Sequence, residues 1–117
     1  MKNVVLLGST GSIGTSTCKV TKDLPDDIRL IGLAAGRNTK LLREQVEQFS
    51  PSAISINCPD VAKELANEFN GKPEVFYGEE GLLKLATLPE ADIVLIAIVG
   101  TAGLQPALAA IRAGKDI

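Results

Sequence analysis

The chain has 117 residues and a formal net charge of −2, and 3 % of its residues are aromatic. This length suits one domain with a single core. The balance of charge and the scarcity of aromatics exclude the basic surfaces and stacking platforms of nucleic-acid binders, so we expect no nucleic-acid partner. Because the sequence contains no histidine, it also excludes a Ser-His-Asp triad and any histidine-ligated metal within this chain.

The cysteines and the hydropathy pattern predict where the protein works. Cys18 and Cys58 form no C-x-x-C motif, and the first residues lack the charged, apolar and small regions of an export leader. The most apolar stretch, residues 93–99, is far shorter than the roughly 20 residues of a membrane-spanning helix. We therefore expect a protein of the reducing cytoplasm that has no membrane partner.

Short apolar runs alternate with helical periodicity along the whole chain. The apolar runs predict strands over residues 4–7, 28–35, 53–56, 74–77 and 93–99. Helical spacing predicts helices through Ile13, Thr17, Val20 and Leu24 before Pro25, through Leu42, Val46 and Phe49 before Pro51, through Val61, Leu65 and Phe69, over residues 82–88, and through Leu104, Leu108 and Ile111. For the last helix we expect Pro106 in the first turn and a glycine cap at Gly114.

The strands are apolar at consecutive positions rather than at alternate ones. Such strands are buried on both faces, which indicates a parallel sheet with helical crossovers on each side. The sequence therefore predicts a Rossmann-like, doubly wound α/β fold over residues 1–117, with a mainly parallel sheet and helices on both faces.

The first strand runs into the sequence LGSTGSIG, which places three glycines at a three-residue spacing. In a strand-turn-helix unit, Gly8 makes the tight exit from the strand, Gly11 lets a diphosphate approach the backbone, and Gly14 allows close packing of helix and strand. Thr10 and Ser12 add hydroxyl donors, and the helix N-terminus favours an anion. This G-x-x-G-x-x-G differs from the commoner G-x-G-x-x-G, and a glycine-rich turn without a ligand is the alternative.

The second strand ends in LAAGRN, a sequence that bears on the choice of nicotinamide cofactor. NAD sites usually place a carboxylate here for the adenosine ribose, whereas NADP sites must neutralise a phosphate. This segment offers no carboxylate; Gly36 leaves room, Arg37 supplies a bidentate cation, and Asn38 adds an amide. The pattern favours NADP over NAD, although Arg37 also suits a solvent-facing charge and Asn38 an ordinary helix N-cap.

The third candidate element is AIVGTAGLQPAL, residues 97–108, at the carboxyl end of the last strand. Open α/β sheets bind ligands at this rim. Gly100 and Gly103, with Thr101 and Ala102 between them, would let a ring or ribose pass close to the backbone, so Gly100 and Ala102 join the candidate cofactor residues. A simple strand-to-helix turn is the alternative.

Together these segments resemble the N-terminal NADPH-binding domain of the 1-deoxy-D-xylulose 5-phosphate reductoisomerase family. The resemblance covers essentially the whole chain and rests on LGSTGSIG, LAAGRN, GEEGLLKLA (residues 78–86) and AIVGTAGLQPALAAIRAGKDI (residues 97–117). It implies that Thr10, Gly11, Ser12 and Ile13 lie at the diphosphate and ribose, that Gly36, Arg37 and Asn38 surround the adenosine 2′-phosphate, and that residues 97–102 lie along the nicotinamide half.

The resemblance also implies an activity for the whole protein. The family rearranges 1-deoxy-D-xylulose 5-phosphate with the help of a divalent cation, Mg or Mn, and reduces the aldehyde with NADPH to 2-C-methyl-D-erythritol 4-phosphate. This is a step of the methylerythritol phosphate route to isoprenoids, and family members are homodimers. The chain stops at Ile117, before the family's metal ligands and its residues for the phosphorylated sugar. We therefore expect cofactor binding without turnover and assign no catalytic residue and no metal ligand.

Two other functions are compatible with the same glycine pattern. One is the NADP-binding domain of another oxidoreductase, such as a semialdehyde dehydrogenase or a dihydrodipicolinate-type reductase. The other is a non-catalytic dinucleotide sensor, although no DNA-binding or regulatory element accompanies the motif.

Overall fold

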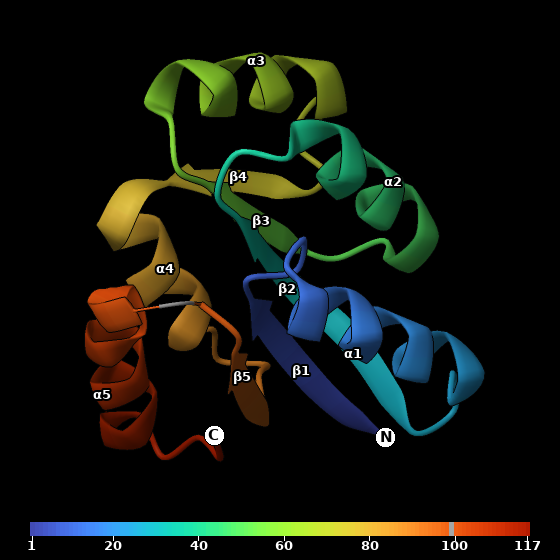
Figure 1. Ribbon diagram of the computed structural model, residues 1–117, viewed down its shortest axis with the longest axis vertical. Coiled ribbons are helices and arrows are strands. Elements are labelled where there is room, and N and C mark those ends of the chain that lie inside the picture. The colour runs from blue at the N-terminus through green and yellow to red at the C-terminus, as the bar shows by residue number, and fades with distance from the viewer. Residues whose placement is uncertain (99) are drawn as a thin grey trace.

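The computed structural model describes residues 1–98 and 100–117. Within these residues, five strands form one sheet in the order β4-β3-β2-β1-β5, and every pairing is parallel (Figure 1). The strands are β1 (Lys2–Leu7), β2 (Ile28–Ala35), β3 (Ala53–Ile56), β4 (Glu74–Tyr77) and β5 (Ile93–Ile96). The predicted parallel sheet is confirmed.

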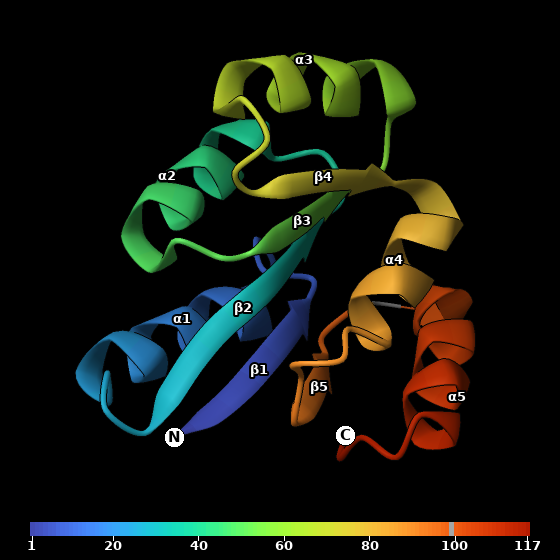
Figure 2. The same ribbon diagram turned by 180° about the vertical axis from the view of Figure 1, so that it is seen from behind.

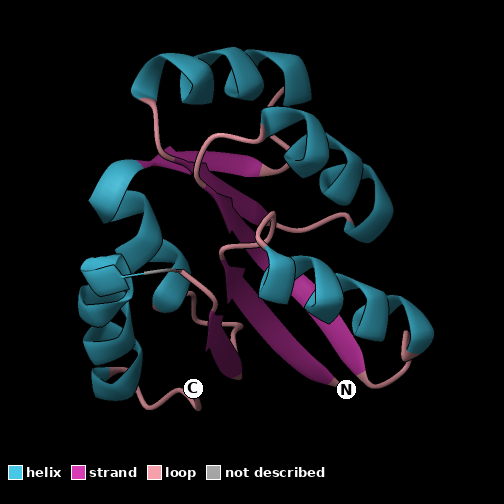
Figure 3. Cartoon of the chain, in the orientation of Figure 1, coloured by secondary structure: helices cyan, strands magenta, loops and turns pink. Residues whose placement is uncertain are grey.

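Helices cover both faces of this sheet. The first face carries α1 (Ser12–Asp23), α2 (Thr39–Phe49) and α3 (Pro59–Phe69), and the second carries α4 (Gly78–Ala86) and α5 (Leu104–Arg112) (Figures 1 and 2). A short 3-10 helix, η1 (Gly100–Gly103), precedes α5. Strands and helices alternate along the described chain (Figure 3). The doubly wound α/β architecture follows from this arrangement.

The strand sequences explain why the sheet is buried on both sides. Successive side chains of a strand point to opposite faces, and in β1 both sets are apolar. Val4 and Leu6 belong to the core under α1, α2 and α3, whereas Val5 and Leu7 belong to the core under α4 and α5. The continuous apolar run therefore supplies two cores, which holds β1 at the centre of the fold.

Most predicted ranges match the structure, and three differ. The strand expected over residues 4–7 begins at Lys2. The strand expected over residues 93–99 ends at Ile96, and Val99 lies outside the described residues. The helix expected over residues 82–88 runs from Gly78 to Ala86. Its early start places Glu79 and Glu80 in the first turn, where carboxylates interact favourably with the helix dipole.

Two helices turn a different face to the sheet from the one that their apolar residues predict. In α1, Ile13, Val20 and the following Leu24 are 64 %, 50 % and 41 % exposed, and the buried residues are Gly14, Cys18 and Thr21. In α5, likewise, the leucines and isoleucine at positions 104, 108 and 111 are exposed, and Pro106 and Ala110 are buried. In both helices the buried face consists mainly of small residues, and the larger apolar residues are exposed.

The end of α5 has the predicted glycine cap. Gly114 has φ +77°, its N–H donates to the Ile111 carbonyl at 3.0 Å, and the Lys115 N–H donates to the Ala110 carbonyl at 2.9 Å. These two bonds form a Schellman motif, which needs a left-handed residue at the position of Gly114. Pro106 stands at the third residue of the helix, within the first turn as expected.

Gly114→Ala is expected to lower the free energy of unfolding by about 1 kcal/mol, because a Cβ disfavours the left-handed conformation. Gly114→Asn is the matched control, since asparagine tolerates this conformation better and should lose less. Urea unfolding of the three proteins measures the difference. Equal stability of Gly114→Ala and the parent chain would contradict the assigned cap.

Candidate functional site

The sheet order creates a crevice beside β1. The chain proceeds from β1 to β2, β3 and β4 on one side, and then returns through α4 to place β5 on the other side of β1. The segments that follow β1 and β5 therefore leave the sheet in different directions. Ligands of open α/β sheets bind at such a switch point, outside the carboxyl ends of the strands.

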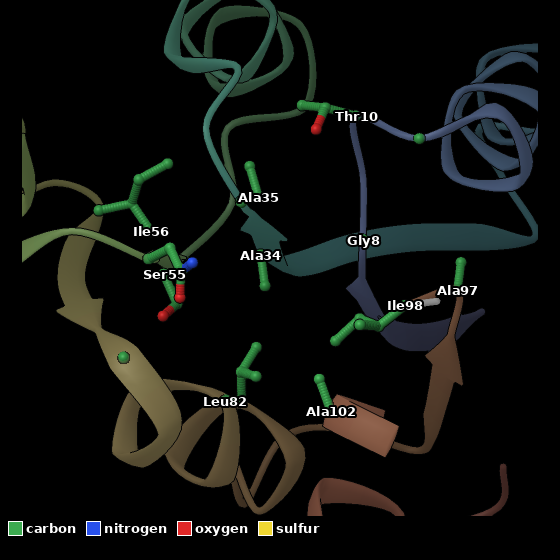
Figure 4. Close-up of a pocket in the computed structure, with 14 residues that line it drawn as sticks. Gly8, Thr10, Ala34, Ala35, Ser55, Ile56, Leu82, Ala97, Ile98 and Ala102 are labelled. Atoms are coloured by element: carbon green, nitrogen blue, oxygen red, sulfur yellow. The ribbon is translucent and has the colours of Figure 1, made fainter. Parts of the chain in front are cut away.

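A cavity of about 270 Å³ lies at this place (Figure 4). It is framed by the segments after β1, β2, β3 and β5, by the start of α4 and by η1. Its lining residues are Gly8, Thr10, Gly11, Ala34, Ala35, Gly36, Ser55, Ile56, Asn57, Gly78, Leu82, Ala97, Ile98 and Ala102. None of these side chains is charged; most are small or apolar, and Thr10, Ser55 and Asn57 are polar.

The glycine-rich loop after β1 is held tightly against its neighbours. The N–H groups of Gly8 and Ser9 both donate to the Ala34 carbonyl at 2.8 Å. Gly8 has φ +97°, and a Cβ there would lie 2.7 Å from the Ala97 carbonyl oxygen. A Cβ on Gly14 would overlap the Gly8 carbonyl oxygen and the Ser9 backbone. These two glycines are therefore required by close contacts within the protein.

Gly11 differs from Gly8 and Gly14 because its surroundings are open. The nearest atom to a Cβ built at Gly11 is the Gly8 carbonyl oxygen at 3.7 Å. Gly11 is the N-cap of α1, and no side chain caps this helix end. The first N–H groups of a helix have no intrahelical acceptor. An anion that enters the cavity can therefore approach main-chain N–H groups at the start of α1.

The end of β2 presents a free cation beside the cavity. A Cβ built at Gly36 meets nothing within 4 Å, and Arg37 is exposed. Within residues 1–98 and 100–117, the one salt bridge joins Arg43 to Glu68, so Arg37 is not engaged by a carboxylate there. Asn38 is the N-cap of α2, and its Oδ1 accepts from the Leu41 N–H at 3.1 Å. This bond uses the amide oxygen, so the Nδ2 group of Asn38 is available to donate to a phosphate.

The predicted site residues divide into two groups. Gly8, Thr10, Gly11, Gly36 and Ala102 line the cavity. The second group does not line it and lies within three positions of a lining residue in the chain: Ser12, Ile13, Gly14, Arg37 and Asn38. Gly100 begins η1, and the surroundings of Gly100 and Thr101 lie outside the described part. Their contacts with a ligand remain predictions.

The sequence reasoning missed the lining residues that come from β3 and α4, namely Ser55, Ile56, Asn57, Gly78 and Leu82. The signal was present in the strand prediction. All strands are parallel, so the carboxyl end of β3 reaches the same rim as the glycine loop. Gly78, with φ +66°, marks the sharp turn that brings α4 over this rim.

Other kinds of site have no support in the described residues. Over residues 1–98 and 100–117, no group of three or more Cys, Asp or Glu side chains could hold a metal ion. Burial raises the pKa of the Cys18 thiol, which packs in the core on the inner face of α1. No helix in the described residues is long and apolar enough to span a bilayer.

Comparisons with known proteins agree with this geometry. Residues 4–117 match the model of the 1-deoxy-D-xylulose 5-phosphate reductoisomerase family. The chain is 49 % identical over its whole length to the proteins of that name from Citrifermentans bemidjiense and Shouchella clausii, and it spans 31 % of each of them. The chain thus corresponds to about a third of these relatives.

Solved structures give the same result. A crystal structure of DOX-P reductoisomerase in complex with NADPH, fosmidomycin and magnesium superposes with a TM-score of 0.91 at 34 % identity, over 98 % of this chain and 29 % of that one. The Zymomonas mobilis enzyme in complex with NADPH gives a TM-score of 0.87 at 36 % identity, over 97 % of this chain and 30 % of that one. The sequence match and the shared fold agree, and the chain belongs to the 1-deoxy-D-xylulose 5-phosphate reductoisomerase family.

Proposed function

We propose that residues 1–117 form an NADPH-binding domain and that the cavity beside β1 receives the cofactor. The observation that carries this proposal is the pairing of an open, uncapped helix start at Gly11 with an unengaged arginine, Arg37, at the next strand end. The first suits a diphosphate and the second suits an additional phosphate on the adenosine ribose. NADPH carries both groups.

The residues present fit this cofactor. The glycine loop would hold the diphosphate through the main chain at Gly11, Ser12 and Ile13, with the Thr10 and Ser12 hydroxyls as further donors. Gly36 leaves the space, and Arg37 the charge, for the 2′-phosphate. The small residues after β5, including Ala97 and Ala102, would let the nicotinamide half lie close to the backbone. Bound NADPH supplies a hydride, and this chain orients it.

The activity of the whole protein is proposed on the basis of the family. Relatives of this chain are reductoisomerases, and their solved structures contain NADPH and magnesium. We propose that the whole protein converts 1-deoxy-D-xylulose 5-phosphate to 2-C-methyl-D-erythritol 4-phosphate in isoprenoid biosynthesis, as a cytoplasmic homodimer with a divalent cation. We assign no metal ligand and no catalytic residue to this chain, which we expect to bind NADPH without turnover.

Titration calorimetry of the 117-residue chain with NADPH and with NADH tests the proposed function. We expect NADPH to bind at least about tenfold more tightly, which corresponds to about 1.4 kcal/mol for the additional phosphate contact. Comparable affinity for the two cofactors would contradict the assignment of Arg37. The absence of binding by both would contradict the cavity as a cofactor site.

A further inference from the structure

A glutamine occupies a core position of α2. Gln45 stands beside Val46 on the buried face of this helix and is 4 % exposed. Its Nε2 donates to the Ser9 carbonyl at 2.8 Å, in a buried hydrogen bond between residues 36 positions apart. The bond joins α2 directly to the glycine-rich loop.

This bond sets the direction of one peptide group in the loop. The Ser9–Thr10 peptide bond is trans, so its carbonyl and its N–H point in opposite directions. Because the Ser9 carbonyl points to α2, the N–H of Thr10 points away from that helix. No main-chain carbonyl of the described residues accepts from this N–H, and Thr10 lines the cavity (Figure 4).

The remaining supports of the loop do not fix this peptide plane. The Ala34 carbonyl receives the N–H groups of Gly8 and Ser9, and Gly14 lets α1 pack against the Gly8 carbonyl. None of these contacts is a hydrogen bond to the Ser9 carbonyl or to the Thr10 N–H. Among the described residues, Gln45 is the side chain that holds the Ser9 carbonyl.

The contact between Gln45 and Ser9 pairs one buried carbonyl and leaves other buried polar atoms unpaired. The described residues contain two buried side-chain polar atoms without a partner, Ser9 Oγ and Gln45 Oε1, and both belong to this contact. Buried polar atoms without partners are destabilising. An apolar side chain of the same size would remove the Gln45 Oε1 atom from the core, but it would leave the buried Ser9 carbonyl without its donor.

We propose that Gln45 is a positioning residue, which turns the Thr10 N–H toward the cofactor diphosphate. This inference rests on the proposed NADPH site. Without the hydrogen bond the Ser9–Thr10 peptide can rotate, and only a fraction of the molecules then present the N–H to the ligand. The apparent dissociation constant rises in inverse proportion to that fraction.

The test measures two ligands on the 117-residue chain by calorimetry. NADPH contains the diphosphate, whereas adenosine 2′-monophosphate carries only the phosphate assigned to Arg37. For Gln45→Met, which is similar in size but cannot donate, we expect the dissociation constant of NADPH to rise about tenfold. The melting temperature should fall, because the buried Ser9 carbonyl loses its donor. The value for adenosine 2′-monophosphate should stay the same, which also shows that the variant remains folded at the temperature of the titration.

Gln48→Met is the matched control, because Gln48 lies on the same helix but is exposed; it should change neither ligand. Gln45→Leu is a second variant, whose apolar side chain also cannot donate to a carbonyl, and it should reproduce the loss of NADPH affinity. Unchanged NADPH affinity in both Gln45 variants, or an equal loss for both ligands, would overturn the role of Gln45 alone. Failure of the parent chain to bind NADPH would overturn the proposed function and this role with it.

Discussion

Gly14→Ala is expected to lower the free energy of unfolding by about 3 kcal/mol, at the upper end of the range for overpacking a core. A Cβ at this position would overlap the Gly8 carbonyl oxygen and would lie 2.8 Å from backbone atoms of Ser9. These neighbours are main-chain atoms held by hydrogen bonds to the Ala34 carbonyl, so they cannot move aside cheaply. Helix α1 must shift away from the loop, and urea unfolding measures the loss.

The same shift should weaken NADPH binding, because it separates the start of α1 from the loop that forms the other half of the proposed diphosphate site. Gly36→Ala is the matched control for stability. It is the same substitution, but its Cβ meets nothing within 4 Å, so the change in free energy of unfolding should not exceed about 1 kcal/mol. Equal effects of the two substitutions would show that the close contact at Gly14 is not required.

Arg37→Ala is expected to weaken NADPH binding by about 1–3 kcal/mol, the range for hydrogen bonds to charged groups. The guanidinium is exposed and is the cation that follows β2, where the adenosine ribose of a bound dinucleotide is expected. NADH has no phosphate at this position, so its affinity should stay nearly the same. Calorimetry with both cofactors measures the two changes.

Arg43→Ala provides the control for a general effect of positive charge. Arg43 lies on α2 and pairs with Glu68 at 2.9 Å, so its loss removes the same charge from the same region without emptying the predicted phosphate site. NADPH affinity should therefore change little. A similar loss for Arg37→Ala and Arg43→Ala would indicate long-range attraction in place of a specific contact.

The order and type of the secondary-structure elements were predictable because two simple signals agree. Strands such as β2 and β3 are largely apolar runs, in which Arg29 and Ser55 are the polar residues, and their predicted bounds match the structure. Helices α2 and α3 carry their apolar residues on the face that packs on the sheet, with Leu42 and Leu65 fully buried. In these elements, the residues that form the periodic apolar pattern are also the residues that tertiary packing buries.

The faces of α1 and α5 were not predictable from apolar periodicity. Gly14 faces the loop after β1 because a Cβ at this position would overlap the main chain of that loop. This orientation of α1 turns Ile13 and Val20 outward. In α5, the apolar stripe is likewise displaced by the burial of Pro106 and Ala110. A helix that packs closely on its neighbours needs small residues on its buried face. Small residues contribute little to a hydropathy pattern, so that pattern does not identify the buried face.

The position of the candidate site followed from the chain order, but its full composition did not. The loops after β1 and β2 reach the cavity as the glycine pattern and the strand end predict. Ser55 and Leu82 come from segments without any motif, and only the strand order brings them there. Gln45 was likewise not predicted as a functional candidate. A glutamine within the apolar stripe of α2 nevertheless indicates a buried polar contact.

A crystal structure of the chain with bound NADPH would locate both phosphate groups of the cofactor. We predict diphosphate oxygens within hydrogen-bond distance of main-chain N–H groups between Thr10 and Ile13, and 2′-phosphate oxygens on the Arg37 guanidinium. A cofactor bound outside the cavity beside β1, or an adenosine end remote from Arg37, would contradict the proposed NADPH site.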